Sequence, residues 1–160
     1  MRLQVFTVFV FVLYSFSSFA MKVTPSTRVC VLTCESDYDV YSVYGHTALR
    51  IQDTSQEVDV VINYGVFSSG TDNFIYKFSK GETDYKAAAE PFDLFIEEYE
   101  YYNRSVYENE LNLTDSSKQV LFDYLDWNLQ PENRVYRYKF FSDNCATRVR
   151  DLIERITVVV

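Results

Sequence analysis

Histidine, cysteine, glycine and proline are scarce in this sequence of 160 residues, which contains one, three, four and three of them, respectively. A single histidine without a Cys-x-x-Cys pair leaves too few soft ligands for a zinc site, and we expect neither a metal nor a cofactor. With so little glycine and proline the chain has no low-complexity segment, and it has no internal repeat. We therefore expect one compact domain. A G-x-S-x-G motif is also absent, which disfavours a serine hydrolase without excluding it.

The first 20 residues are typical of an export signal. Met1 and Arg2 precede the nearly continuous apolar run VFTVFVFVLYSF, and Ser18 and Ala20 are small residues at the positions that a signal peptidase reads. The apolar run is shorter than the ~20 residues that a membrane-spanning helix needs. We expect a signal peptide over residues 1–20, cleaved after Ala20, and a mature domain over residues 21–160.

Positive charge is in the minority, with 15 basic against 23 acidic residues and a net charge of -8. The sequence has no basic stripe, so nucleic acid is not an expected partner. Aromatic residues make up 18% of the chain, with 14 tyrosines and 13 phenylalanines. This richness favours β-structure and is typical of secreted or envelope proteins.

The spacing of the predicted elements indicates an α+β fold, an antiparallel sheet packed against helices. Strands are expected over 28–34, 44–52, 58–67, 104–113 and 133–141, and the segment 74–89 suggests two more strands around a turn at Gly81. Helices are expected over 91–102, over 115–129 with Thr114 as the cap, and over 145–156.

The odd number of cysteines sets one of them apart. Cys30 and Cys34 lie in a single predicted strand. Four residues along a strand span ~13 Å, whereas a disulfide needs Cα atoms within ~7 Å, so these two cannot pair with each other. Both are explained as small apolar residues of a core strand. Cys145 is left over, where the polar turn Ser142-Asp143-Asn144 leads into the last helix.

A nucleophilic role for Cys145 requires a partner. A free thiol with a pKa of ~8.5 needs at least ~2 kcal/mol of preference for the anion before its pKa falls below 7. A helix N-terminus contributes only ~0.3–1 kcal/mol, so an imidazolium must supply the rest. The only imidazole in the chain belongs to His46. A cysteine heading a helix beside a histidine on a sheet is the geometry of papain-like thiol enzymes, here with the histidine first in the sequence.

The base also needs a residue that orients it. A two-residue turn at 54–55 would place His46 opposite Asn63 on the same face of a hairpin. A slip of one residue would substitute Tyr64, and Asp59 is another candidate. The amide of Cys145 and the side chain of Asn144 could hold an oxyanion, with Asp143 as a supporting residue of the same turn. The predicted site is thus Cys145, His46 and Asn63, supported by Asn144, Asp143 and Tyr64.

Several separated segments together resemble the Lnb-type N-terminal periplasmic domain. They are LTC…YSVYGHTALRI, VINYGVF, YNRSVYENELNLT and LQPENRVYRYKFFSDNCATRVRDLI, and they span about residues 29 to 155 in the family's order. The family's GH pair falls on Gly45-His46 and its DNC on Asp143-Asn144-Cys145. The sequence departs from the pattern at Asn109, where glutamine is usual. Family members also continue into membrane-spanning helices, and we expect this chain to lack that part.

The resemblance implies a permuted papain-like fold, similar to NlpC-like and lecithin:retinol acyltransferase-like thiol enzymes, in the periplasm or cell envelope. It also implies an acyltransferase that moves a phospholipid acyl chain through a cysteine thioester to the α-amine of a lipoprotein, at a membrane surface. A cysteine peptidase or amidase acting on cell-wall peptides would use the same residues. A catalytically inactive binding module is the third hypothesis.

Overall fold

A six-stranded antiparallel sheet is the centre of the computed structural model, which describes residues 22–67 and 73–158. The strands are β1 (Thr27–Cys34), β2 (His46–Asp53), β3 (Val58–Phe67), β4 (Asp84–Pro91), β5 (Val106–Glu110) and β6 (Val135–Arg137). Their order across the sheet is β5-β1-β2-β3-β4-β6. The predicted α+β class is confirmed. The predicted signal peptide, residues 1–20, lies outside the described residues.

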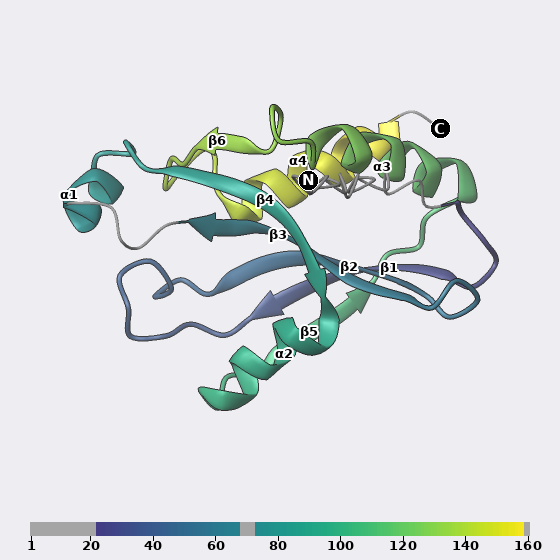
Figure 1. Cartoon of the computed structure of the whole chain (residues 1–160), viewed down its shortest axis with the longest axis horizontal. Helices are drawn as coiled ribbons and strands as arrows, with labels where there is room; N and C mark the ends of the chain where they lie inside the picture. The colour runs from purple at the N-terminus through teal and green to yellow at the C-terminus, as the bar shows by residue number, and fades with distance from the viewer. Residues whose placement is uncertain (1–21, 68–72, 159–160) are drawn as a thin grey trace, which may run out of the picture.

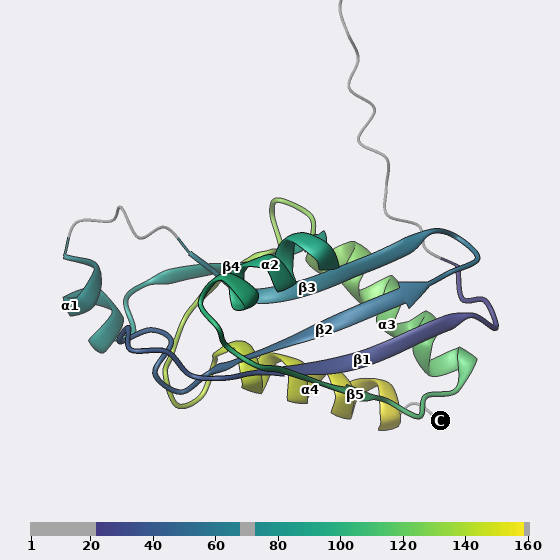
Figure 2. The ribbon, with the colours of Figure 1, turned by 90° about the horizontal axis from the view of Figure 1, so that it is seen from below.

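Helices cover both faces of the sheet (Figures 1 and 2). The helices α3 (Asp115–Asn128) and α4 (Cys145–Val158) lie on one face, and α2 (Phe92–Tyr101) lies on the other. This follows from the alternation of side chains along each strand. In β2, Leu49 belongs to the core under α3 and α4, whereas Ala48 belongs to a smaller core that includes Phe95 of α2.

The three longer helices match their predictions. Thr114 caps α3, because its side-chain oxygen accepts a hydrogen bond from the Ser117 amide at 3.2 Å. Pro91 immediately precedes α2, where its missing N–H costs no helical hydrogen bond. The apolar stripe of α4 is buried at Val149, Leu152 and Ile156. Burying such side chains stabilises the fold by ~1.5–3 kcal/mol each, so this stripe determines where α4 begins and how it is oriented on the sheet.

The first of the two strands expected in 74–89 is instead a helix, α1 (Phe74–Ser79). The aromatic residues there suggested a strand, but Phe74 and Phe78 stand four apart and stack with ring centroids 5.9 Å apart on one side of a helical turn. Both belong to an aromatic cluster, since Phe74 also stacks on Phe67 at 4.9 Å and Phe78 on Tyr138 at 5.4 Å. Tertiary packing therefore overrides the β-propensity of this segment.

The hairpin between β2 and β3 has a longer turn than expected. Asp53 pairs with Val58, which leaves four residues, 54–57, in the turn, with Glu57 at φ 55°. The register is therefore shifted by two residues from the predicted one. Continued along β2, it places Gly65 rather than Asn63 opposite His46. Since the side-chain period of a strand is two, Asn63 stays on the same face as His46.

Two further corrections lie at one end of the sheet, and β5 is shorter at both ends than the expected 104–113. β2 begins at His46 rather than Tyr44, because Gly45 adopts φ 76° and turns the chain into the strand. A Cβ at Gly45 would lie 2.5 Å from the carbonyl oxygen of Cys34, so only glycine fits there. β6 is limited to residues 135–137, because its three residues pair with β4 and the chain then turns toward Cys145. All three cysteines are free.

Candidate active site

Cys145 is the first residue of α4, and Asn144 caps this helix. The Asn144 side-chain oxygen accepts from the Thr147 amide at 2.9 Å, and the Thr147 hydroxyl accepts from the Asn144 amide at 2.8 Å. The Asn144 side-chain nitrogen donates to the Phe140 carbonyl at 2.7 Å. Both polar atoms of this side chain hold the start of the helix. It is therefore a cap that positions Cys145, and an oxyanion donor has to come from elsewhere.

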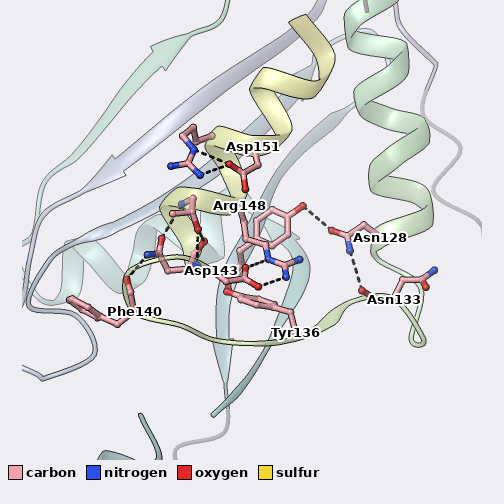
Figure 3. A network of polar contacts seen from close by, with 11 residues as sticks. Asn128, Asn133, Tyr136, Phe140, Asp143, Arg148 and Asp151 are labelled. Atoms are coloured by element: carbon pink, nitrogen blue, oxygen red, sulfur yellow. Dashed lines mark hydrogen bonds and ion pairs between the residues drawn. The ribbon is translucent and has the colours of Figure 1, made fainter. Parts of the chain in front are cut away.

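Asp143 also stabilises this turn. Its carboxylate accepts two hydrogen bonds from Arg148, at 2.6 and 2.9 Å, and the guanidinium lies 4.0 Å from the centre of the Tyr136 ring. Figure 3 shows this arrangement, with Arg148 directed back at Asp143 beside Tyr136. A bidentate pair of this kind fixes geometry as well as charge. The side chain of Asp143 is thus committed to Arg148 and supports the turn from the side of the helix.

The sulfur of Cys145 sits among backbone amides. Burial raises the pKa of the thiol above its usual value, while N–H groups of Thr47, Ala146 and Cys145 itself facing the sulfur lower it in part. Thr47 lies before Leu49, the first residue of β2 that pairs with β3, so its amide can turn to the sulfur. Two of these N–H groups belong to the helix N-terminus and one to β2, and donors of this kind stabilise a developing oxyanion.

His46 is held by Asn63 on the neighbouring strand. The ring nitrogen Nε2 lies 3.0 Å from the Asn63 side-chain oxygen. That oxygen also accepts from the Gly65 amide at 2.7 Å, and the Asn63 side-chain nitrogen donates to a carboxylate oxygen of Glu90 at 3.0 Å. These two contacts determine which end of the amide faces the ring. Since an amide oxygen only accepts, Nε2 carries the proton and Nδ1 keeps its lone pair.

Gly65 makes this contact sterically possible. A Cβ at this position would lie 2.6 Å from Cε1 and 3.2 Å from Nδ1 of His46. The imidazole therefore crosses directly over the glycine and reaches the diagonal position of Asn63. The two-residue register shift and the missing side chain of Gly65 together explain how His46 contacts a residue that is not its direct cross-strand neighbour.

The thiol of Cys145 and the imidazole of His46 are both uncharged at pH 7. Burial of the ring lowers the pKa of His46 to about 4, helped by the charge of Arg104 and opposed by the hydrogen bond to Asn63. The pKa of Cys145 moves in the other direction, because burial raises it. The sequence had predicted a thiolate–imidazolium pair at neutral pH, and the structure gives the opposite directions for both groups. His46 is thus available as a base, and the resting sulfur is a thiol.

A cavity of about 680 Å³ is lined by both Cys145 and His46. It lies across one end of the sheet, where β1, β3 and β6 end and β2, β4 and β5 begin. On the β5–β1 side its lining is polar and includes Cys34, Asp37, Glu98, Tyr99 and Arg104. Toward β3, β4 and β6 it is aromatic and includes Tyr41, Tyr44, Phe67, Tyr85, Tyr138 and Phe140. This volume lies in the usual range of small-molecule sites.

Two other candidates lie outside this cavity. The Tyr64 hydroxyl donates to Asn128 at 2.9 Å in the core beneath α3, on the face of the sheet opposite to Asn63. Asp59 forms a bidentate pair with Arg50, with distances of 2.6 and 2.7 Å. The structure thus brings together Cys145, His46 and Asn63 around one cavity and places Tyr64 and Asp59 elsewhere.

Sequence reasoning missed Thr47, Gly65, Glu90 and Arg104. The identity of Thr47 carries no signal, because only its backbone amide faces the sulfur. Glu90 and Arg104 reach the site through the pairing of β4 with β3 and the position of β5 beside β1. Of these four residues, only Gly65 could have been found from the sequence, because a glycine inside a predicted strand often indicates close approach of another group.

Comparison with known proteins places the chain in a family. In the described part of the chain, no helix is both long and apolar enough to cross a membrane. Neither a curated protein nor a solved structure matches the chain significantly. The family model of the Lnb N-terminal periplasmic domain matches residues 15–159, which indicates an envelope location, and the chain belongs to this family.

Proposed function

We propose that this protein is an exported thiol acyltransferase of the lipoprotein N-acylation class. It would take an acyl chain from a phospholipid, hold it as a thioester on Cys145, and transfer it to the free α-amine of a lipoprotein. The observation that carries this proposal is the shared cavity of Cys145, at the start of α4, and His46, whose Nε2 is fixed by Asn63. The order of the residues, histidine first and cysteine last, is that of a permuted papain-like enzyme.

The first half-reaction forms the thioester. Nδ1 of His46 accepts the thiol proton, and the sulfur attacks the carbonyl carbon of the phospholipid ester. The carbonyl oxygen becomes an oxyanion that the N–H groups of Thr47, Ala146 and Cys145 stabilise. When the carbonyl re-forms, the C–O bond to the glycerol backbone breaks. The leaving alkoxide takes the proton from His46, so a lysophospholipid departs and the acyl chain remains on Cys145.

The second half-reaction transfers the acyl group. The neutral α-amine of the acceptor attacks the thioester carbonyl, and His46 accepts one of its protons. The C–S bond breaks as the amide forms, and His46 returns the proton to the sulfur. Thiol and imidazole are both neutral at the start and at the end of the cycle, in agreement with their resting state.

The aromatic half of the cavity supports a lipid as the donor. Tyr41, Phe67 and Tyr85 line it, and Phe67 contacts the rings of the other two at 5.1 and 4.8 Å. Such a lining suits an acyl chain better than a polar peptide. Nearby aromatic side chains are also exposed, with 79% of Tyr44 and 90% of Phe141 accessible. Tyr44 lines the cavity and Phe141 contacts Phe140 of its lining, and exposed aromatic residues beside such a cavity favour a membrane surface as the source of the donor.

The test is to trap the acyl-enzyme. The protein is mixed with vesicles of a phospholipid carrying a labelled acyl chain, and the label is expected on Cys145 in a linkage that neutral hydroxylamine cleaves. Cys145→Ser should abolish this label, whereas Cys34→Ser removes the other thiol of the cavity and should retain it. Thermal unfolding of both variants checks that they fold. The absence of a thioester in the wild-type protein would refute the proposal.

The fate of the thioester decides between transferase and hydrolase. Addition of a diacylated lipopeptide with a free α-amine should yield the N-acylated product faster than the free fatty acid. Release of the fatty acid alone, or cleavage of cell-wall peptides, would indicate a peptidase or amidase with the same residues. A protein that binds the phospholipid but forms no thioester on Cys145 would indicate an inactive binding module.

A further inference from the structure

Arg104 is a buried cation at the polar end of the cavity. Its side chain is 9% exposed, and its Nε and Nη2 both donate to the carbonyl oxygen of Glu35. Nη1 lies 3.7 Å from the nearest carboxylate oxygen of Asp37, beyond hydrogen-bond length. The guanidinium also packs over the Tyr99 ring, 4.7 Å from its centre, which fixes its plane. Among the described residues Asp37 is the ion-pair partner of Arg104, at a distance too long for a hydrogen bond, and a buried charge is stabilised when an anion completes its contacts.

The position of Arg104 relative to the reacting pair follows from the strand order. Arg104 precedes β5 and is bound to Glu35, which follows β1, whereas His46 begins β2. Since the order is β5-β1-β2-β3-β4-β6, His46 lies between Arg104 and the aromatic half of the cavity. The charge of Arg104 acts on His46, since it lowers the pKa of the ring. A donor with its acyl chain at the aromatic end would therefore extend its polar end toward Arg104.

The charges around Arg104 indicate which polar group fits. Asp37 and Glu98 line the same end of the cavity, and Arg104 is the only arginine or lysine in the described lining. A phosphate without a counter-charge would meet these carboxylates as well as the guanidinium. A headgroup with an ammonium beside its phosphate is complementary to both charges, because the phosphate can bind the guanidinium and the ammonium can bind the carboxylates.

We propose that Arg104 and Asp37 form a headgroup subsite that binds a zwitterionic phospholipid, with the phosphodiester on Arg104 and the ammonium group on Asp37. This inference rests on the proposed function, because it names the class of acyl donor. It makes the headgroup, and not only the acyl chain, a determinant of which lipid is used.

Binding of short-chain lipids to the Cys145→Ala protein tests the subsite without any chemistry. Dihexanoylphosphatidylethanolamine, dihexanoylphosphatidylglycerol and inorganic phosphate are titrated separately by calorimetry. The ethanolamine lipid should bind about tenfold more tightly than the glycerol lipid, and inorganic phosphate should not compete with it at equal concentration. Arg104→Gln should weaken binding of the ethanolamine lipid on the order of 10- to 100-fold, since it removes a charge-assisted contact. Asp37→Asn should remove the preference between the two lipids.

Two controls keep the outcome clear. Arg104→Lys retains the charge and should bind better than Arg104→Gln, and its melting temperature reports whether the Glu35 contact is needed for folding. Arg28→Gln removes an arginine from the exposed pair with Glu110 and should leave binding unchanged. Equal binding of both lipids, equal competition by inorganic phosphate, or an unaffected Arg104→Gln protein would overturn the subsite. Selective binding without thioester formation would refute the acyltransferase and leave the subsite standing.

Discussion

Replacing Gly65 by alanine is the sharpest test of the geometry around His46. The added methyl would lie 2.6 Å from Cε1 of the imidazole and 3.1 Å from the Asn63 side-chain oxygen. Ordinary contacts of this kind begin at about 3.4 Å, so the ring must move by 0.8 Å, the difference between 3.4 and 2.6 Å. Gly65 does not have the positive φ that only glycine tolerates easily, so the substitution perturbs the ring and not the backbone.

The expected effect is large on chemistry and moderate on stability. A displacement of ~1 Å at a reacting group costs on the order of 100-fold in rate, and the shift also stretches the 3.0 Å contact between Nε2 and Asn63. Overpacking by one methyl typically destabilises a fold by ~1–3 kcal/mol. We therefore expect Gly65→Ala to lower the rate of thioester formation about 100-fold. The folded protein should remain, with a lower melting temperature.

A double-mutant cycle separates this clash from a general effect of the methyl group. In the His46→Ala background the ring is gone, so adding Gly65→Ala should cost much less stability than it does in the wild type. The free energies of unfolding of the four proteins are measured by urea denaturation, alongside single-turnover thioester formation for the two that keep His46. A Gly65→Ala protein with wild-type rate and stability would show that the imidazole does not cross this glycine.

Three further predictions concern the pair and the fold. Asn63→Ala leaves Nε2 without its acceptor, so thioester formation should fall roughly 100-fold in a protein that still folds; an unaffected rate would contradict the orienting role. Thiol alkylation of Cys145 should keep rising with pH beyond ~8.5, because burial raises its pKa, and thioester formation should be lost only as the pH falls through about 4, the pKa of His46; an alkylation plateau between pH 5 and 8 would instead reveal an ion pair. Burial raises the pKa of Asp53, but hydrogen bonds from Ser55, Thr24 and others lower it below its usual value, so the carboxylate stabilises the fold above pH ~4 and this contribution is lost on acidification. Asp53→Asn should accordingly lower the melting temperature at pH 7 more than at pH 3, and equal losses at both would argue against this linkage.

The fold was predictable where local patterns and burial agree. Thr114 as a cap and the spacing of Val149, Leu152 and Ile156 are each determined by one helix and its face, so the limits of α3 and α4 were close to correct. The prediction of a strand over 74–79 was wrong because the aromatic rings of this segment pack in a tertiary cluster, which local propensity does not describe. The predicted length of the turn after Asp53 was wrong because that length depends on hydrogen bonds that the Asp53 carboxylate accepts from amides of the turn.

The positions of the candidate residues were predictable, and their electrostatics was not. His46 and Cys145 were expected to share a site and line one cavity, and the contact of Asn63 with His46 followed from strand parity, which a two-residue error in register leaves intact. The protonation states could not be predicted, because they depend on how much protein surrounds each group. Desolvation dominates the pKa values of both His46 and Cys145, and no local pattern encodes it.

The neutral resting pair has a consequence for how the proposed reaction would be controlled. Burial and the positive charge of Arg104 both make His46 a weak base, so the empty site does not ionise Cys145. An anionic phosphodiester on Arg104 would cancel part of that charge and raise the basicity of His46. The same headgroup would displace water from the polar end of the cavity, which strengthens the remaining electrostatic interactions. Deprotonation of the thiol would then be favoured when a donor occupies the cavity, and the sulfur would stay protected as a thiol at other times.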